Sequence, residues 1–326
     1  MKAKRNRVRV FWREVTNKCS EKEAADAIGA LFRAAGFERL VVRDGFCMLK
    51  LHFGERGNPN HIEAKFVRPL VEILKSYKMK VFCSDTNTLY RGGRHNAVEH
   101  LMTAYEHGFT PEYLGCPVII ADGLVGMCET KVKIKGKHFS EVALAADLEY
   151  VDTLFVLSHL TGHIAVGMGC AIKNLGMGLA TRGGKLAQHN AQPLEVDERK
   201  CVACGFCAEH CPQEAIKVGK VAKIDSKRCI NCGYCIAVCK PGAVKFSWEI
   251  SSQVLQERIA EYAAGVLIKV KNVGFFNFLL KIAKDCDCIG EKSDIICDDV
   301  GVLASDDVVA IDAASCEIVK EAAHND

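Results

Sequence analysis

The sequence has no long apolar run. Its apolar stretches, such as 266–268 and 275–280, are far shorter than the roughly 20 residues that a membrane-spanning helix needs. The basic residues among the first 13 positions are not followed by the apolar segment of a secretory signal. We therefore expect a protein that neither crosses a membrane nor is exported, and we expect it in the cytoplasm.

The sequence also has little net charge. It holds 43 Lys and Arg against 40 Asp and Glu, and a formal charge of +3 is too small to predict binding to nucleic acid or to a membrane surface. Hydrophobic residues make up 49% of the chain and charged residues 25%, as in ordinary folded proteins. A chain of 326 residues is long enough for two domains or for one large domain with an insertion.

Cysteine, in contrast, is abundant. The chain has 18 cysteines, and eight of them fall between Cys201 and Cys239. Without a secretory signal, such a cluster is more typical of metal ligands than of a disulfide framework, because reducing compartments keep thiols free.

The clustered cysteines form two strings with the same spacing. Each string has the pattern Cys-x2-Cys-x2-Cys-x3-Cys, and equivalent cysteines lie 28 residues apart. The flanks repeat as well, since Ala-Cys-Gly-Phe-Cys at 203–207 matches Asn-Cys-Gly-Tyr-Cys at 231–235. The repeat indicates an internal duplication. The eight cysteines are Cys201, Cys204, Cys207, Cys211, Cys229, Cys232, Cys235 and Cys239.

This spacing is typical of ligands for two [4Fe–4S] clusters. Three closely spaced thiolates hold one cluster, and the fourth cysteine of the string reaches the other cluster. The rule assigns one cluster to Cys201, Cys204, Cys207 and Cys239. It assigns the second cluster to Cys229, Cys232, Cys235 and Cys211. Two alternatives stay open: paired Cys-x2-Cys motifs also bind zinc, and clusters can serve only to stabilise a fold.

The cysteine strings and their flanks resemble the bacterial two-cluster ferredoxins over about 50 residues, with all eight ligands included. The segment departs from that pattern at Lys240, where the first string has Pro212. Over 192–246 its 9 Lys and Arg outnumber its 6 Asp and Glu, whereas free ferredoxins are typically acidic. The resemblance therefore implies a fixed electron relay and not a mobile carrier.

Outside this segment, β-type runs alternate with amphipathic stretches, which predicts an α/β fold with a mostly parallel sheet. The expected strands are 8–12, 46–53, 80–84, 118–121 and 153–158. The expected helices are 21–35, 64–77, 97–107, 140–149 and 253–264. The C-terminal stretch is too short for a core of its own. We therefore expect an α/β domain formed by 1–191 and 249–326, with an inserted α+β two-cluster ferredoxin-like module at 192–248.

Short motifs are spread over nearly the whole chain. They are Lys-Leu-His-Phe-Gly-Glu at 50–55, Asp-Thr-Asn-Thr-Leu-Tyr at 85–90, Ala-Asp-Gly-Leu at 121–124, Leu-Ser-His at 157–159, Lys-Asn-Leu-Gly-Met-Gly at 173–178 and Cys-Asp-Cys at 286–288. In these motifs the chain resembles the domain of unknown function 362 family, an uncharacterised group of iron–sulfur-centre proteins. It departs from the family at 168–170, where Met-Gly-Cys replaces Phe-Gly-Gly, and at 305–309, where no proline follows the aspartate. The resemblance implies no particular substrate.

Basic side chains gather in the polar, glycine-rich loops beside the predicted strands. They are Lys50, His52, Arg91, Arg94, Lys173, Lys185 and His189. Such loops can bind an anion through backbone N–H groups, and Lys or Arg completes the charge. We therefore expect a small anionic substrate, a carboxylate or a phosphate. The alternative is that the glycines form ordinary turns and the charges are solvated.

The candidate catalytic residues are His52, His159, His163, Lys173 and His189. His159 and His163 would share a face of a helix and could bind a metal there, but Gly162 between them favours a loop and a hydrogen-bonding or acid–base role. Cys286 and Cys288 could be additional metal ligands, a redox dithiol or buried thiols. The other cysteines are expected in the core, and the aspartates at 298–312 in caps, turns or a cation site.

Two functions follow from these observations. The first is a ferredoxin-dependent oxidoreductase, in which electrons pass from the clusters to a small anionic substrate or a redox partner protein at the α/β domain. The second is a non-catalytic iron–sulfur adaptor or electron carrier whose α/β domain binds a protein partner. Convergence of the five candidate catalytic residues on one pocket would favour the enzyme.

Overall fold

The structure is a computed structural model that describes residues 8–189 and 192–323. The basic residues before position 8, and the predicted domain boundary at residue 191, lie outside the described residues. Within the described part of the chain, no helix is both long and apolar enough to cross a bilayer.

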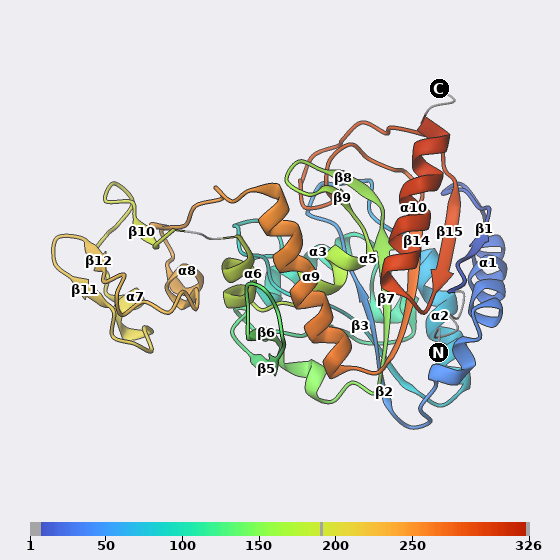
Figure 1. Ribbon diagram of the computed structural model, residues 1–326, viewed down its shortest axis with the longest axis horizontal. Coiled ribbons are helices and arrows are strands. Elements are labelled where there is room, and N and C mark those ends of the chain that lie inside the picture. The colour runs from blue at the N-terminus through green and yellow to red at the C-terminus, as the bar shows by residue number, and fades with distance from the viewer. Residues whose placement is uncertain (1–7, 190–191, 324–326) are drawn as a thin grey trace, which may run out of the picture.

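A seven-stranded sheet forms the centre of the molecule (Figure 1). The strand order is β1-β15-β14-β7-β2-β3-β4, and the five strands from β14 to β4 run parallel to one another. β1 and β15 pair antiparallel at one edge. The strands are β1 (Phe11–Arg13), β2 (Phe46–Leu51), β3 (Lys80–Asp85), β4 (Val118–Ile120), β7 (Thr153–His159), β14 (Asn272–Leu279) and β15 (Gly301–Ser305). The predicted α/β fold with a mostly parallel sheet is confirmed.

Helices cover both faces of the sheet, and β7 shows why its sequence is apolar throughout. Phe155 and Leu157 pack into the core on one face, and Leu154 and Val156 pack into the core on the other, because side chains alternate along a strand. The first core lies under α1 (Glu21–Ala34), α2 (Ala64–Ser76), α3 (Ala97–Glu106) and α4 (Pro111–Leu114). The second lies under α5 (Ala171–Gly176), α9 (Ser252–Lys269) and α10 (Val308–Ala323).

The start of α1 agrees with the local sequence. The Ser20 side chain accepts a hydrogen bond from the Glu23 N–H, and the Glu23 carboxylate accepts one from the Ser20 N–H, which completes a capping box. Ala24, Ile28 and Leu31 recur at helical spacing and are buried against the sheet. Capping and periodicity together therefore place this helix correctly from the sequence.

One predicted helix is wrong. Residues 140–149 form strand β6 (Glu141–Ala145), which pairs antiparallel with β5 (Glu129–Lys133), followed by the 3-10 turn η2 (Ala146–Glu149). Val142 and Leu144 are both fully buried, and they are separated by a partly exposed residue, so the segment follows a period of two. Pairing with β5 outweighs the helix-favouring Ala, Leu and Glu of this stretch.

The chain leaves the central sheet after β7 and returns to it at β14. In between, the segment 192–248 projects to one side of the sheet beyond α6 (Arg182–His189) (Figure 1). It contains the strand pairs β10 (Glu195–Val196) with β13 (Val244–Lys245) and β11 (Ile216–Val218) with β12 (Ala222–Ile224). It also contains the short helices α7 (Phe206–Glu209) and α8 (Tyr234–Val238). The residues after the segment supply β14 and β15, so both flanks belong to one sheet.

Neighbouring strands β2 and β7 send the chain to opposite faces. β2 connects to β3 through α2 on one face, whereas β7 connects to β14 through α5 and α9 on the other. Loops that diverge from two adjacent parallel strands leave a crevice at the carboxyl ends of those strands, where α/β proteins commonly bind ligands.

Candidate functional site

A pocket of about 480 Å³ lies at this crevice. Its volume falls within the range of about 300–1,000 Å³ that is usual for small-molecule sites. Residues at the carboxyl ends of three parallel strands line it, including Lys50, Asp85 and His159. The structure brings all five candidate catalytic residues to this one pocket: His52, His159, His163, Lys173 and His189. Cys286 and Cys288 line the same pocket.

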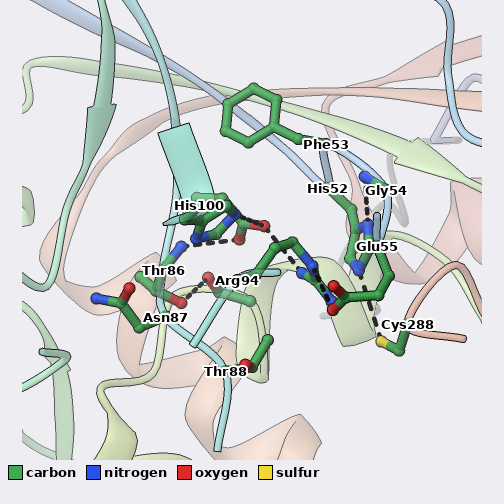
Figure 2. Close-up of polar contacts among 12 residues, drawn as sticks. His52, Phe53, Gly54, Glu55, Thr86, Asn87, Thr88, Arg94, His100 and Cys288 are labelled. Atoms are coloured by element: carbon green, nitrogen blue, oxygen red, sulfur yellow. Dashed lines mark hydrogen bonds and ion pairs between the residues drawn. The ribbon is translucent and has the colours of Figure 1, made fainter. Parts of the chain in front are cut away.

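The two cysteines of the Cys-Asp-Cys motif lie next to each other and next to a lysine. The sulfur atoms of Cys286 and Cys288 are 3.1 Å apart. The Lys173 ammonium donates a hydrogen bond to the Cys286 sulfur at 3.1 Å. On the other side, His52 Nε2 lies 3.5 Å from the Cys288 sulfur (Figure 2). The thiol pair is therefore held between two cationic or hydrogen-bonding side chains.

The tautomer of His52 follows from its second contact. The Gly54 backbone N–H donates to His52 Nδ1 at 2.9 Å, so Nδ1 is the acceptor (Figure 2). In the neutral ring the proton must then lie on Nε2, which faces Cys288. Gly54 allows this tight turn because its φ is +84° and a Cβ at this position would lie 2.9 Å from atoms of His61 and His107.

These contacts shift the pKa values of the two thiols in opposite directions. The hydrogen bond from Cys286, followed by the charges of Lys173 and His52, lowers the pKa of Cys288 well below its ordinary value. The same hydrogen bond and burial raise the pKa of Cys286 well above its ordinary value. Although burial opposes it, the charge of the two cysteines raises the pKa of Lys173, so the lysine stays protonated.

His159 forms a buried ion pair with Asp287. Its Nδ1 lies 2.8 Å from Asp287 Oδ2, and its Nε2 lies 2.6 Å from the Leu280 carbonyl oxygen. Both nitrogens thus face acceptors, which requires the doubly protonated ring. Burial opposes this charge, but Asp287 outweighs it and raises the pKa of His159. Since Asp287 stands between Cys286 and Cys288, the pair holds the cysteine loop in place.

His163 and His189 differ from His159 because they have no acidic partner among the described residues. Burial lowers the pKa of each ring to about 4, so both are neutral near pH 7. His189 contacts the Met177 sulfur at 3.1 Å and the Trp248 ring at a centroid distance of 4.7 Å. His163 ends strand β8 (Thr161–His163), which pairs with β9 (Gly167–Gly169), so the segment is not a helix, but it is a strand and not the loop that Gly162 favoured.

The loop that carries the two cysteines is docked on the loop after β2. The Glu55 N–H donates to the Asp287 carbonyl at 3.0 Å, and the Asn58 side chain donates to the Ile289 carbonyl at 2.9 Å. Gly57 has a φ of +88°, and a Cβ there would lie 2.6 Å from the Gly290 carbonyl oxygen. Only glycine permits this close approach of the two backbones.

A buried network of charges supports the pocket wall, and the sequence indicates its two cations but no role for their acidic partners. Lys50 lies 2.9 Å from Asp85, and Arg94 lies 3.5 Å from Asp85. Arg94 also lies 3.3 Å from Glu55 (Figure 2). The Tyr90 hydroxyl donates to the Cys288 carbonyl at 3.2 Å. In the sequence, Asp85 follows the predicted strand 80–84 and opens a polar loop. Glu55 stood out only as the last residue of the motif at 50–55, since it meets Arg94 only in the folded chain.

Like Lys173, Lys185 has no carboxylate partner within ion-pair distance among the described residues, and the hydrogen-bond partners of its ammonium are uncharged. Its ammonium donates to the Thr86 hydroxyl at 2.5 Å and to the Ala180 carbonyl at 2.6 Å. Burial lowers the pKa of Lys185 to about 8, although Asp122 opposes the shift. Arg91, in contrast, lies outside the pocket, and its guanidinium donates to the Cys239 carbonyl of the cysteine-rich segment.

Of the aspartates at 298–312, Asp312 has a capping role. Its two carboxylate oxygens accept hydrogen bonds from the Ala171 and Ile172 N–H groups, each at 2.9 Å. These groups open α5, the helix that carries Lys173. Asp312 therefore helps to position the lysine beside the thiol pair.

The cysteine-rich segment contains two small cavities, each with four cysteines in its wall. One is bordered by Cys201, Cys204, Cys207 and Cys239. The other is bordered by Cys229, Cys232, Cys235 and Cys211. Each cavity takes three cysteines from one string and the last cysteine of the other string.

The backbone around the two cavities repeats with the sequence. Ala203 and Asn231, which are 28 residues apart, have φ values of +52° and +53°. The N–H groups of Ala215 and Ala243 donate to the sulfur atoms of Cys211 and Cys239, each at 3.2 Å. The duplication seen in the sequence is thus also a duplication of local conformation and of N–H···S hydrogen bonds.

The cysteine sulfurs in these cavities are arranged differently from the ligands of a single ion. Within residues 8–189 and 192–323, no three His, Cys, Asp or Glu side chains converge closely enough to share one ion. A cubane needs no such convergence, because each of its four irons takes one thiolate. Four thiols spread over an apolar cavity wall therefore fit a [4Fe–4S] cluster as a donor set.

The other cysteines follow the expected pattern in part. Cys47, Cys83, Cys116, Cys170 and Cys297 are buried in the cores. Cys19 and Cys316 are partly exposed, and Cys128 is exposed. The prediction of core thiols is therefore wrong for Cys128, which lies after a turn that precedes the β5–β6 hairpin.

Two solved structures match this chain at low sequence identity. A protein from Thermotoga maritima is 9% identical, with a TM-score of 0.48, and the match covers 95% of this chain and 61% of that protein. The lactate racemase apoprotein from Thermoanaerobacterium thermosaccharolyticum is 10% identical, with a TM-score of 0.43, and the match covers 84% of this chain and 51% of that protein. This chain thus spans less than two thirds of either structure. No curated protein matches the sequence.

A family profile, in contrast, matches most of the chain. It covers residues 47–317, which include the pocket, the cysteine-rich segment and the Cys-Asp-Cys motif. The chain belongs to the family described as domain of unknown function (DUF362).

Proposed function

We propose that this protein binds two [4Fe–4S] clusters in segment 192–248 and relays electrons to a small anionic substrate in the pocket of the α/β domain. One observation carries the proposal. The two cavities of the segment are each bordered by four cysteines, and the division of the cysteines between them matches the crossed ligand pattern of two-cluster ferredoxins.

Clusters bound by these cysteines would supply one-electron chemistry. The residues of the chain would then bind, shield and connect them. Phe206 and Tyr234 border one cavity each and limit the access of water. N–H groups that donate to ligand sulfurs, such as those of Ala215 and Ala243, stabilise thiolate charge and thereby tune the potential of a bound cluster.

The segment contacts the α/β domain next to the pocket. A Cβ on Gly183 of α6 would lie 2.8 Å from the Cys232 carbonyl oxygen, so the two backbones are in close contact. Lys185 and His189 of the same helix line the pocket. The cavity bordered by Cys232 is therefore linked to the pocket through a single helix, which favours a fixed relay.

An anionic substrate is favoured by the balance of charges in the pocket. Lys50 and Arg94 are neutralised by Asp85 and Glu55, and Lys173 faces the thiol pair. Lys185 contacts uncharged oxygens at its ammonium group. A carboxylate or phosphate beside Lys185 would supply the charge that the protein leaves unmatched at this point.

The cluster assignment is tested by metal analysis of protein purified without oxygen. We expect about eight irons and eight sulfides per chain, with low-temperature EPR of two interacting reduced cubanes. Cys204→Ala and Cys232→Ala should each lose mainly one cluster, because each residue borders a different cavity. Cys128→Ala is the matched control, since this exposed cysteine lies outside both cavities and its loss should leave iron unchanged.

Colourless protein without iron, or protein with zinc at one ion per Cys-x2-Cys pair, would overturn the assignment. The adaptor alternative makes a different prediction. It requires clusters but no ligand in the pocket, whereas convergence of the five candidate catalytic residues on the pocket supports the enzyme.

A further inference from the structure

The proposed function leaves Cys286 and Cys288 unexplained. They lie outside both cysteine cavities and line the substrate pocket instead. Their sulfurs are 3.1 Å apart, and Lys173 and His52 flank them at 3.1 and 3.5 Å. We propose that Cys286 and Cys288 form a redox-active dithiol that exchanges two electrons with a small disulfide bound in the pocket.

Proximity of two thiols does not by itself make a redox pair, and this chain offers a comparison. The Cys83 and Cys116 sulfurs are 3.7 Å apart, yet Cys83 in β3 and Cys116 just before β4 are both buried in the core. The pocket does not reach them. Cys286 and Cys288 differ because they adjoin a cavity of about 480 Å³ and because the Lys173 ammonium donates a hydrogen bond to the Cys286 sulfur.

A metal site is the other use for two cysteines beside a histidine. Cys286, Cys288 and His52 would supply the three protein ligands of a catalytic zinc site. Yet the described residues contain no three such side chains that converge on one ion. The 3.1 Å contact between the sulfurs instead brings them close enough for one thiol to attack a disulfide formed by the other.

The exchange can be written with balanced atoms and charge. The Cys288 thiolate attacks one sulfur of the substrate disulfide, a Cys288–substrate S–S bond forms, and the substrate S–S bond breaks to release one thiolate. Cys286 then loses its proton to that thiolate and attacks the Cys288 sulfur, which forms the Cys286–Cys288 disulfide and releases the second half as a thiolate. One thiol and one thiolate of the protein thus become one thiol and one thiolate of the products.

Reduction of the Cys286–Cys288 disulfide back to one thiol and one thiolate needs two electrons and one proton. The two clusters proposed for segment 192–248 could supply the electrons one at a time, and only here does the inference rest on the proposed function. A small dithiol can replace that source in the test, so the two ideas can fail separately.

The test uses the full chain, purified without oxygen, in buffers that contain reduced and oxidised dithiothreitol at stepped ratios. After an acid quench, free thiols are alkylated and the protein is digested with trypsin. Cleavage after Lys284 and Lys292 releases peptide 285–292, which contains Cys286 and Cys288 and no other cysteine. We expect this peptide to pass reversibly from the doubly alkylated form to the internal disulfide, with both cysteines changing together.

The control in the same digest is the Cys83 and Cys116 pair. Its peptides should stay alkylated throughout, because those thiols have no access to the pocket. Peptide 285–292 that remains doubly alkylated at every ratio would overturn the proposal. So would protection of both thiols by a bound zinc ion. Iron measured on the same samples shows whether the cluster proposal stands or fails independently.

Lys173 provides a second test that does not depend on the disulfide. Loss of its charge should raise the pKa of Cys288, so Lys173→Gln should slow alkylation of Cys288 near pH 7 by about tenfold or more. Lys173→Arg should largely restore the rate, and the alkylation rate should rise at higher pH in Lys173→Gln than in the unaltered protein. Equal rates in all three proteins would show that no stabilised thiolate exists.

Discussion

Breaking the ion pair between His159 and Asp287 should make the free energy of unfolding depend strongly on pH. The two side chains are 3% and 6% exposed, and their atoms are 2.8 Å apart. Replacement of Asp287 by Asn keeps the shape but leaves a buried imidazolium without its carboxylate. Removal of one partner of a buried pair costs about 3–5 kcal/mol, which is a large part of the stability of an ordinary domain.

The sign of the pH dependence follows from the two pKa shifts. The pKa of His159 is raised, so its contribution is complete below its unfolded value of 6.5 and is lost as pH rises through the folded value. The carboxylate of Asp287 has a lowered pKa, because His159 outweighs burial, so its contribution is complete above 3.8 and is lost as pH falls through the folded value. The pair therefore stabilises the fold most between about pH 4 and 6.5.

In Asp287→Asn the pKa of His159 should fall, because burial then acts without the carboxylate. The unfolded chain then binds one more proton than the folded chain below pH 6.5. In this range the free energy of unfolding should therefore fall by about 1.4 kcal/mol for each pH unit by which the pH is lowered. As pH rises through the raised folded pKa of His159, the unaltered protein loses its charged pair, so its difference from Asp287→Asn should shrink.

Urea unfolding of anaerobic protein between pH 5 and 8.5, followed by tryptophan fluorescence, measures these differences. The double variant Asp287→Asn/His159→Gln completes a cycle, and it should lose less stability than the sum of the single variants, because no buried charge is left alone. A pH-independent penalty, or strictly additive losses, would refute the argument that this is a charged pair.

Two further predictions concern the pocket and its contact with the cysteine-rich segment. Binding of malonate or inorganic phosphate, measured by titration calorimetry, should weaken as pH rises through about 8, where Lys185 loses its proton. Lys185→Gln should abolish this pH dependence. An unchanged pH profile in the variant would show that Lys185 does not bind the anion. Gly183→Ala should place a methyl group 2.8 Å from the Cys232 carbonyl oxygen, so we expect faster amide hydrogen exchange over 229–239. The control Gly219→Ala, where a methyl group has open space around it, should leave that exchange unchanged. Equal exchange in both variants would show that α6 does not hold the segment.

Local sequence was sufficient for much of the fold. The capping box at Ser20 and Glu23 and the apolar runs of β2, β3 and β7 place these elements within one or a few residues. The helix predicted at 140–149 was wrong for a physical reason, since β6 exists only because it pairs with β5. Composition cannot reveal a pairing partner that lies elsewhere in the chain.

Some residues of the candidate site could likewise be recognised from the local sequence, whereas others could not. The Cys-Asp-Cys motif and the histidines stand out in the sequence, because cysteine and histidine in glycine-rich loops are chemically conspicuous. Glu55 and Tyr90 do not stand out, and their contacts with Arg94 and Cys288 join residues from distant parts of the chain. Long-range contacts of ordinary residues leave no local pattern.

The sequence by itself determined the spacing of the eight clustered cysteines, the duplication that relates them and the alternation of strands and helices, because each of these is a property of neighbouring residues. Only the tertiary structure decided that the histidines, Lys173 and the Cys-Asp-Cys motif meet in one pocket. The reason is topological: β2 and β7 lie side by side but send the chain to opposite faces, so their carboxyl ends bring together loops that are more than 100 residues apart in the sequence.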